Sequence, residues 1–193
     1  MKINSFRKRY LLGCSGILLA TALPGQATSL DVTFTANLRE TTCDMAIEGG
    51  SGNGKNNIIP VGANGAVSLD KIISGDSAAQ ATFKLKITEC PSSLQSLKTT
   101  VSGTKSGYKD TVIINGATTA DAADYLGISI ARASATDAPF VINASSDAGR
   151  LLWSSQEINN KEVPLVATLV ETQTGQGTTG TFSALATFNF TYE

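Results

Sequence analysis

The sequence contains no histidine, and only 16% of its 193 residues are charged. The absence of histidine excludes Ser-His-Asp and Cys-His catalysis, histidine-ligated zinc and histidine pH switches. Lysine and arginine do not outnumber the acidic residues, so no basic surface for nucleic acid is predicted. No motif supports catalysis by paired carboxylates either. We therefore predict a protein that is not an enzyme, binds no nucleic acid, and has no metal site and no cofactor.

Long apolar runs are also scarce, and the longest one lies near the N-terminus. Residues 11–23 are apolar, follow a basic segment at residues 2–9, and precede the small residues Gly25 and Ala27. The run is shorter than the roughly 20 residues that span a membrane, and this order of segments is typical of a secretory signal peptide. We predict cleavage after Ala27. The mature chain then carries 11 basic and 16 acidic residues, and its net charge falls from −1 to −5.

Cysteine is rare, with three residues in the chain, and Cys14 lies within the predicted signal peptide. Its removal leaves Cys43 and Cys90 as one pair in an exported protein. Compartments outside the cytoplasm are oxidising, and a cysteine pair there usually forms a disulfide. We therefore predict a Cys43–Cys90 disulfide.

Apolar and polar residues alternate with a period of two along the mature chain, which predicts β-strands. The segments concerned are 30–38, 82–88, 126–132 and 182–192, whereas 163–170 is nearly continuously apolar, as in a buried or an edge strand. Turns rich in glycine, serine and threonine separate these segments, and none has a long helical period. Many short strands in a chain of this length favour a single all-β sandwich.

One glycine-rich segment and one tryptophan raise the question of ligand binding. Residues 49–56 nearly fit the phosphate-binding pattern GxxxxGK[ST], but Asn56 replaces the required hydroxyl and no helix start follows. We predict a turn there. Trp153 and Tyr108 could stack on a sugar, which defines an alternative function as a self-contained exported lectin-like binding module. A single tryptophan in a sandwich is more often part of the core.

Four features, in this order along the chain, resemble the type 1-like chaperone–usher fimbrial subunits (pilins) of bacteria. The signal peptide is followed by an alternating segment that leads into Cys43. A second alternating segment ends at Cys90, which Pro91 follows. The chain closes with alternating apolar residues between Gly180 and the penultimate Tyr192. The resemblance covers nearly the whole mature chain.

This resemblance implies an incomplete immunoglobulin-like β-sandwich that is completed by a donor strand from a neighbouring subunit. Such β-strand addition also removes the aggregation hazard of an open sheet edge. The implied partners are a periplasmic fimbrial chaperone, an outer-membrane usher and neighbouring fimbrial subunits. The implied division of the chain is a signal peptide at 1–27, a donor-strand extension at 28–42 and a pilin domain at 43–193.

A donor strand needs one apolar face for the groove of its neighbour. The residues that supply this face are Leu30, Val32, Phe34, Ala36 and Leu38. Periodicity alone does not distinguish this role from that of the domain's own first strand. The family commonly has glycine where Ala36 stands, so the choice of neighbour is left open.

On the acceptor side, the resemblance implies that a groove and chaperone-binding strand include Gly180, Phe182, Phe188, Phe190 and Tyr192. We therefore predict a structural, and more specifically a minor, subunit of a bacterial surface fimbrium. It would be exported through the periplasm to the cell surface and contribute to cell adhesion.

Overall fold

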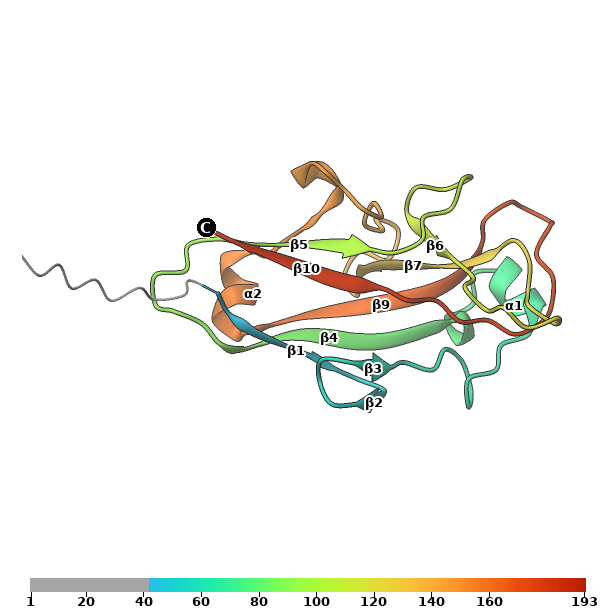
Figure 1. Cartoon of the computed structure of the whole chain (residues 1–193), viewed down its shortest axis with the longest axis horizontal. Coiled ribbons are helices and arrows are strands. Elements are labelled where there is room, and N and C mark those ends of the chain that lie inside the picture. The colour runs from blue at the N-terminus through green and yellow to red at the C-terminus, as the bar shows by residue number, and fades with distance from the viewer. Residues whose placement is uncertain (1–41) are drawn as a thin grey trace, which may run out of the picture. The chain divides into compact units, whose positions relative to one another are not determined.

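The computed structural model describes residues 42–193, which form two antiparallel β-sheets packed face to face with short connecting helices (Figure 1). The first sheet has the strand order β1 (Asp44–Glu48), β4 (Gln80–Glu89), β9 (Glu162–Glu171), β7 (Leu126–Arg132) and β6 (Val112–Ile114). The second sheet has the order β10 (Thr187–Tyr192), β5 (Leu97–Ser102) and β8 (Leu151–Leu152). The predicted signal peptide and the donor residues Leu30 to Leu38 lie outside the described residues.

A small hairpin and four short helices connect the strands. The hairpin consists of β2 (Ser51–Gly52) and β3 (Asn57–Ile58). The helices are α1 (Leu69–Ile73) and α2 (Ser155–Asn160), together with the 3₁₀ turns η1 (Ser77–Ala79) and η2 (Asp147–Gly149). The glycine-rich segment that nearly fits a phosphate loop is this hairpin, so the predicted turn is correct, and no helix begins directly after it.

Strand β4 shows how the alternating sequence forms the sandwich. Its apolar residues Phe83, Leu85 and Ile87 are buried, at 5%, 0% and 4% exposure. The lysines between them lie on the outer face, where Lys84 pairs with Glu162 at 2.9 Å. Burial of one face and solvation of the other is the arrangement that a period of two favours. The strand predicted at residues 82–88 is therefore confirmed.

Strand β9 lies between β4 and β7, so the apolar run at 163–170 is a buried central strand and not an edge strand. Val163 and Leu165 have no exposed surface. Proline is tolerated at position 164 because β7 ends where Arg132 pairs with Leu165. The Pro164 carbonyl oxygen still accepts a hydrogen bond from Ala133 N–H at 3.0 Å, and the N–H that proline lacks would point beyond the end of β7.

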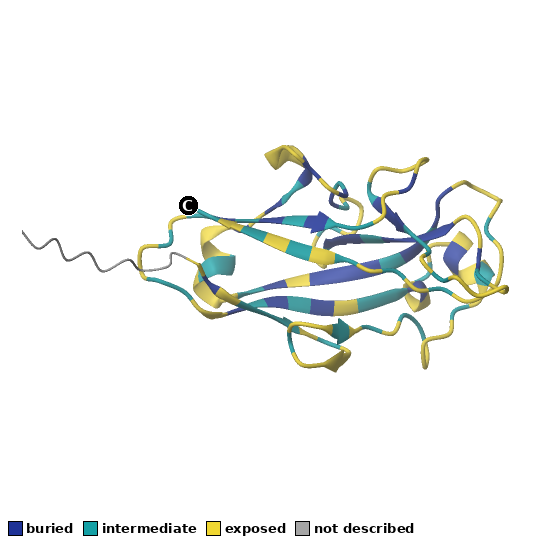
Figure 2. Ribbon diagram, viewed as in Figure 1, coloured by how far each residue is buried: buried dark blue, intermediate teal, exposed yellow. Residues whose placement is uncertain are grey.

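The core lies between the two sheets (Figure 2). Trp153 is part of it, with 6% exposure, and its indole Nε1–H donates to the Thr99 Oγ1 at 2.9 Å. Tyr108, by contrast, is 63% exposed. The tryptophan is therefore not available to stack on a sugar, and the lectin-like alternative loses its main residue.

Candidate functional site

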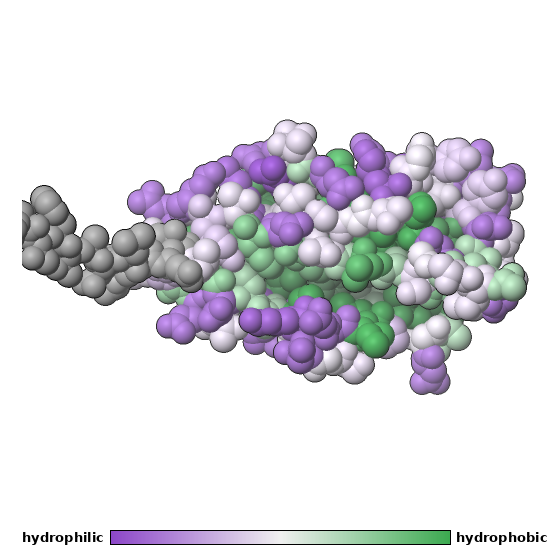
Figure 3. All heavy atoms as spheres, in the orientation of Figure 1, coloured by the Kyte–Doolittle hydropathy of each residue, from purple (hydrophilic) through white to green (hydrophobic). Residues whose placement is uncertain are grey.

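The C-terminal strand β10 and the segment before it present a half-buried apolar face. The residues of this face are Phe182, Ala184, Ala186, Phe188, Phe190 and Tyr192. In Figure 2 the strand alternates between intermediate and exposed residues, whereas β4 and β9 contain fully buried ones. Figure 3 shows apolar atoms gathered along this side of the molecule between hydrophilic rims. The sandwich is thus open along one side, beside β10.

The backbone edge of β10 is open on the same side. Glu193 and Ser96 exchange backbone hydrogen bonds of 3.0 and 2.9 Å, so the odd-numbered residues of β10 pair with β5. In an antiparallel pair the intervening residues point their N–H and C=O groups the other way. Those of Phe188 and Phe190 therefore point to the side where β10 has no neighbouring strand in its sheet. An edge of this kind is a template for strand addition.

The open side of the sandwich is a groove with two walls. The apolar face of β10 and the segment before it form one wall, and strand β1 forms the other. A hollow of about 250 Å³ lies between the two walls. Its lining comes from β1, from the tip of the β2–β3 hairpin and from the C-terminal segment, and comprises Met45, Ala46, Ile47, Gly54, Lys55, Asn56, Leu185, Ala186, Thr187, Phe188 and Phe190. Because most of this lining is apolar and Lys55 is its one charged group, the hollow suits an apolar side chain.

The two walls are tied together at one end of the groove. The Tyr192 hydroxyl donates to the Cys43 carbonyl oxygen at 3.1 Å, and partial burial raises the pKa of Tyr192 above its ordinary value. Cys43 is joined to Cys90 by a disulfide, which links the start of β1 to the end of β4. The predicted disulfide is therefore present.

The chain terminus is also fixed at this end. The Glu193 side chain accepts hydrogen bonds of 3.0 Å from both Lys98 Nζ and Ser96 Oγ, and the Lys98 ammonium holds the pKa of Glu193 below its ordinary value. These contacts hold β10 in register with β5.

Gly180 is not among the residues that line the 250 Å³ hollow, although the resemblance groups it with the groove residues. Its φ is +155°, and a Cβ there would lie 2.1 Å from the Asp121 carbonyl oxygen. That close approach allows Thr181 N–H to donate to the Asp121 carbonyl at 2.8 Å and the Thr181 carbonyl to accept from Ala123 N–H at 3.0 Å. Gly180 thus positions the segment that leads into β10.

Replacing Gly180 by alanine should destabilise the domain, because a Cβ would collide with backbone and the left-handed φ would be strained. We expect the free energy of unfolding to fall by about 2 kcal/mol or more, measured by thermal unfolding. Gly107→Ala is the control, since nothing lies within 4 Å of a Cβ at that position. Equal melting temperatures for the two variants would contradict the close approach at Gly180.

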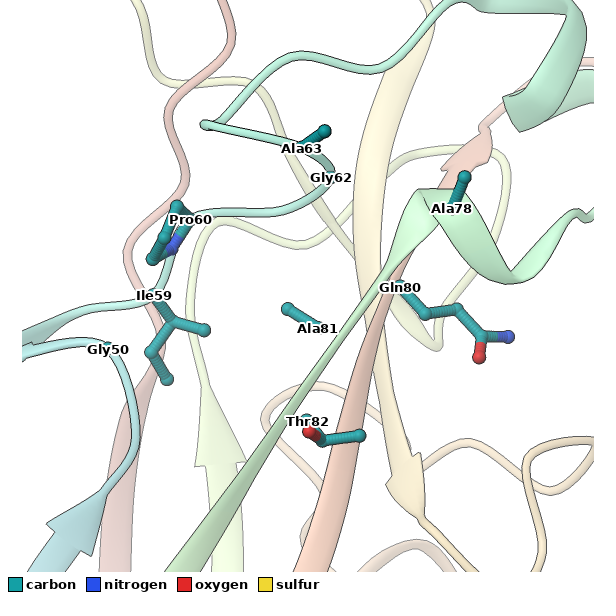
Figure 4. Close-up of a pocket in the computed structure, with 9 residues that line it drawn as sticks. All are labelled: Gly50, Ile59, Pro60, Gly62, Ala63, Ala78, Gln80, Ala81 and Thr82. Carbon is teal, nitrogen blue, oxygen red and sulfur yellow. The ribbon is translucent and has the colours of Figure 1, made fainter.

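A second hollow, of about 510 Å³, lies beside the first half of β4 (Figure 4). Its lining is Gly50, Ile59, Pro60, Gly62, Ala63, Ala78, Gln80, Ala81 and Thr82. None of these side chains titrates, so the lining offers no ionisable acid or base. Within residues 42–193 no group of three Cys, Asp or Glu side chains is placed to hold a metal ion, and no helix there is long and apolar enough to cross a membrane.

Two packed antiparallel sheets form an immunoglobulin-like sandwich, and a solved structure has the same fold. The P pilus rod subunit PapA matches with a TM-score of 0.51 and 18% identity, over 84% of this chain and 100% of PapA. The P pilus adaptor subunit PapF gives a TM-score of 0.48 at 16% identity, over 78% of this chain and 95% of PapF. The all-β, immunoglobulin-like fold is confirmed by the PapA match.

Sequence comparison shows the family. The family model described as "Fimbrial protein" matches residues 32–193. The chain is 33% identical over 185 residues to the uncharacterized fimbrial-like protein YadM of Escherichia coli (strain K12). The aligned region covers 92% of this chain and 93% of YadM. The chain belongs to the fimbrial protein family. It is a structural subunit of a surface fimbrium that assembles with other fimbrial subunits, and it is not an enzyme.

Proposed function

We propose that this subunit is assembled by the chaperone–usher route through donor-strand exchange. The groove between β1 and β10 receives first a strand of a periplasmic chaperone and then, at the outer-membrane usher, the N-terminal extension of a neighbouring subunit. The observation that carries this proposal is the half-buried apolar face of β10 beside an unpaired strand edge. An added strand would cover the face and pair with the edge at the same time.

The chain's own extension, at residues 28–42, fills the groove of another subunit in the same way. Its apolar residues alternate from Leu30 to Leu38, which is about 26 Å of extended chain. Three large apolar side chains buried in a groove contribute roughly 5–9 kcal/mol. The same alternation continues in the acceptor, where apolar residues recur at every second position from Phe182 to Tyr192. Donor and acceptor therefore have matching periods.

The proposal includes the boundaries of the chain's segments, its route of export and its place in the fimbrium. The signal peptide ends at Ala27, the subunit passes through the periplasm, and the pilin domain begins at Cys43. Ala36 stands where the family commonly has glycine, and its additional methyl group either fits a roomier groove or restricts which neighbour accepts this donor. For that reason we assign the chain as a minor subunit, whose contribution to cell adhesion is made through the assembled fibre.

The proposal is tested by the periplasmic yield and state of the mature chain, with and without a fimbrial chaperone. Each sample is then incubated with a synthetic peptide of another subunit's N-terminal strand. We expect the chain to be recovered only as a chaperone complex, from which the peptide releases a more heat-resistant species. A stable monomer that binds neither the chaperone nor the peptide would show that the domain completes its own sheet.

A further inference from the structure

The outward backbone edge of β1 is partly occupied by the chain itself, in contrast to that of β10. Ile47 N–H donates to the Gly54 carbonyl oxygen at 2.6 Å, and Asn57 Nδ2 donates to the Ile47 carbonyl oxygen at 3.2 Å. Successive residues of a strand point their backbone groups to opposite sides. Ala46 directs its groups toward β4, where it pairs with Lys86, and Ile47 therefore directs its own groups away from β4. Both outward backbone groups of Ile47 are therefore already hydrogen-bonded.

Asn57 holds the β2–β3 hairpin in this position. Besides the bond to Ile47, its Nδ2 donates to the Gly49 carbonyl oxygen at 2.9 Å, and its Oδ1 accepts from Gly54 N–H at 2.8 Å. One side chain thus joins β1, the start of the hairpin and its tip. Ser51, in β2 of the same hairpin, is exposed, makes no side-chain hydrogen bond within residues 42–193 and does not line the 250 Å³ hollow.

Glycines fix the shape of the hairpin. A Cβ at Gly50 would lie 2.0 Å from the Ile58 carbonyl oxygen, and one at Gly52 would lie 2.1 Å from the Asn56 carbonyl oxygen. Both residues also have positive φ, at +64° and +156°. The glycine-rich composition of this segment therefore serves a specific backbone path against β1.

The hairpin tip is also a wall of the groove. Gly54, Lys55 and Asn56 line the 250 Å³ hollow together with Ile47 and Phe188. The element that occupies the backbone edge of β1 is thus the same element that bounds the space for an apolar side chain. Any strand that enters the groove beside Phe188 must pass this tip.

We propose that the β2–β3 hairpin is a fixed lip that selects the incoming donor strand, an inference that rests on the proposed function. At the level of Ile47 the donor strand is paired through β10 alone, and on the β1 side it is held by side-chain contacts. The lip limits the size of the one donor side chain that enters the hollow beside it. Asn57 is the positioning residue of this lip.

The experiment uses the mature chain recovered from the periplasm, with the fimbrial chaperone if one is bound. The probes are a peptide of residues 28–42 and five derivatives, each with tryptophan at one of the five apolar donor positions. Binding is measured for the wild type, Asn57→Ala and the control Ser51→Ala, a change at an exposed residue of the same hairpin that does not line the hollow. Amide hydrogen exchange of Ile47, Phe188 and Phe190 is followed before and after peptide addition.

We expect Asn57→Ala to relieve the rejection of tryptophan at one of the five positions by about tenfold and to leave the other four unchanged. Ile47 amide exchange should be slow in the wild type without peptide and about tenfold faster in Asn57→Ala. Ser51→Ala should match the wild type in both measurements. If Asn57→Ala does not fold, Asn57→Asp replaces it, because aspartate keeps the acceptor for Gly54 and loses both N–H donors.

Two failures are distinguishable. If peptides bind and protect the Phe188 and Phe190 amides, but the Asn57 and Ser51 variants behave alike, the lip is refuted and strand addition stands. If no peptide protects those amides in any variant, strand addition into this groove is refuted, and the lip with it.

Discussion

Replacing Phe34 by aspartate should stop this subunit from filling the groove of a neighbour and leave its own domain folded. Phe34 is the largest side chain on the apolar face of the extension. Its loss removes about 2–3 kcal/mol of apolar burial, and the introduced carboxylate would have to be buried without a partner. We expect at least about a 100-fold weaker binding of a Phe34→Asp peptide to an acceptor subunit, measured by displacement of the chaperone.

Thr33→Asp is the matched control for this prediction. It introduces the same charge one residue away, on the polar face of the extension. Its effect on binding should be less than about threefold, as expected for a solvent-exposed position. If Phe34→Asp instead lowers the melting temperature of the subunit that carries it, the segment belongs to that subunit's own core, and its role as a donor is wrong.

Replacing Cys43 by serine should destabilise the domain strongly. The disulfide joins residues separated by 47 positions, and a loop of this length contributes about 4 kcal/mol in the chain-entropy treatment. A loss of that size lowers the melting temperature of a domain of this length by about 10 °C. The tie between β1 and β4 also positions the Cys43 carbonyl that Tyr192 contacts at the end of the groove. Yield from the periplasm should fall accordingly.

The control for the disulfide is Cys14→Ser, a substitution within the predicted signal peptide. It should leave the melting temperature of the mature protein unchanged. The double variant Cys43→Ser/Cys90→Ser should resemble Cys43→Ser, because either change breaks the same bond. Full stability and yield of the double variant would show that the crosslink is dispensable for this fold.

Strands whose two faces differ were predictable from the sequence. Phe83, Leu85 and Ile87 are separated by lysines that remain hydrated, so only one orientation of β4 buries the apolar set. The disulfide was predictable for a different reason, since the two cysteines of the predicted mature chain have one possible intramolecular pairing. In both cases the residues themselves allow one arrangement, of the strand faces in β4 and of the cysteine pair.

The functions of Gly180 and Asn57 were not predictable, because each depends on a segment that is distant in the sequence or on a specific backbone path. Gly180 is needed because the Asp121 carbonyl approaches it closely, a contact between residues far apart in the chain. Asn57 follows a glycine-rich stretch that indicated only a turn, whereas its three hydrogen bonds hold that turn against β1. Periodicity also left open whether the run at 163–170 was a central or an edge strand.

The sequence by itself determined the all-β class and the pairing of Cys43 with Cys90, and it excluded histidine chemistry, because composition and a period of two are properties of the chain alone. It also placed apolar residues at every second position from Phe182 to Tyr192. Only the tertiary structure decided that this face remains half-buried and that the edge of β10 is open while that of β1 is partly closed by a hairpin. Strand pairing depends on which segments meet across the fold, and a one-dimensional pattern does not contain that information.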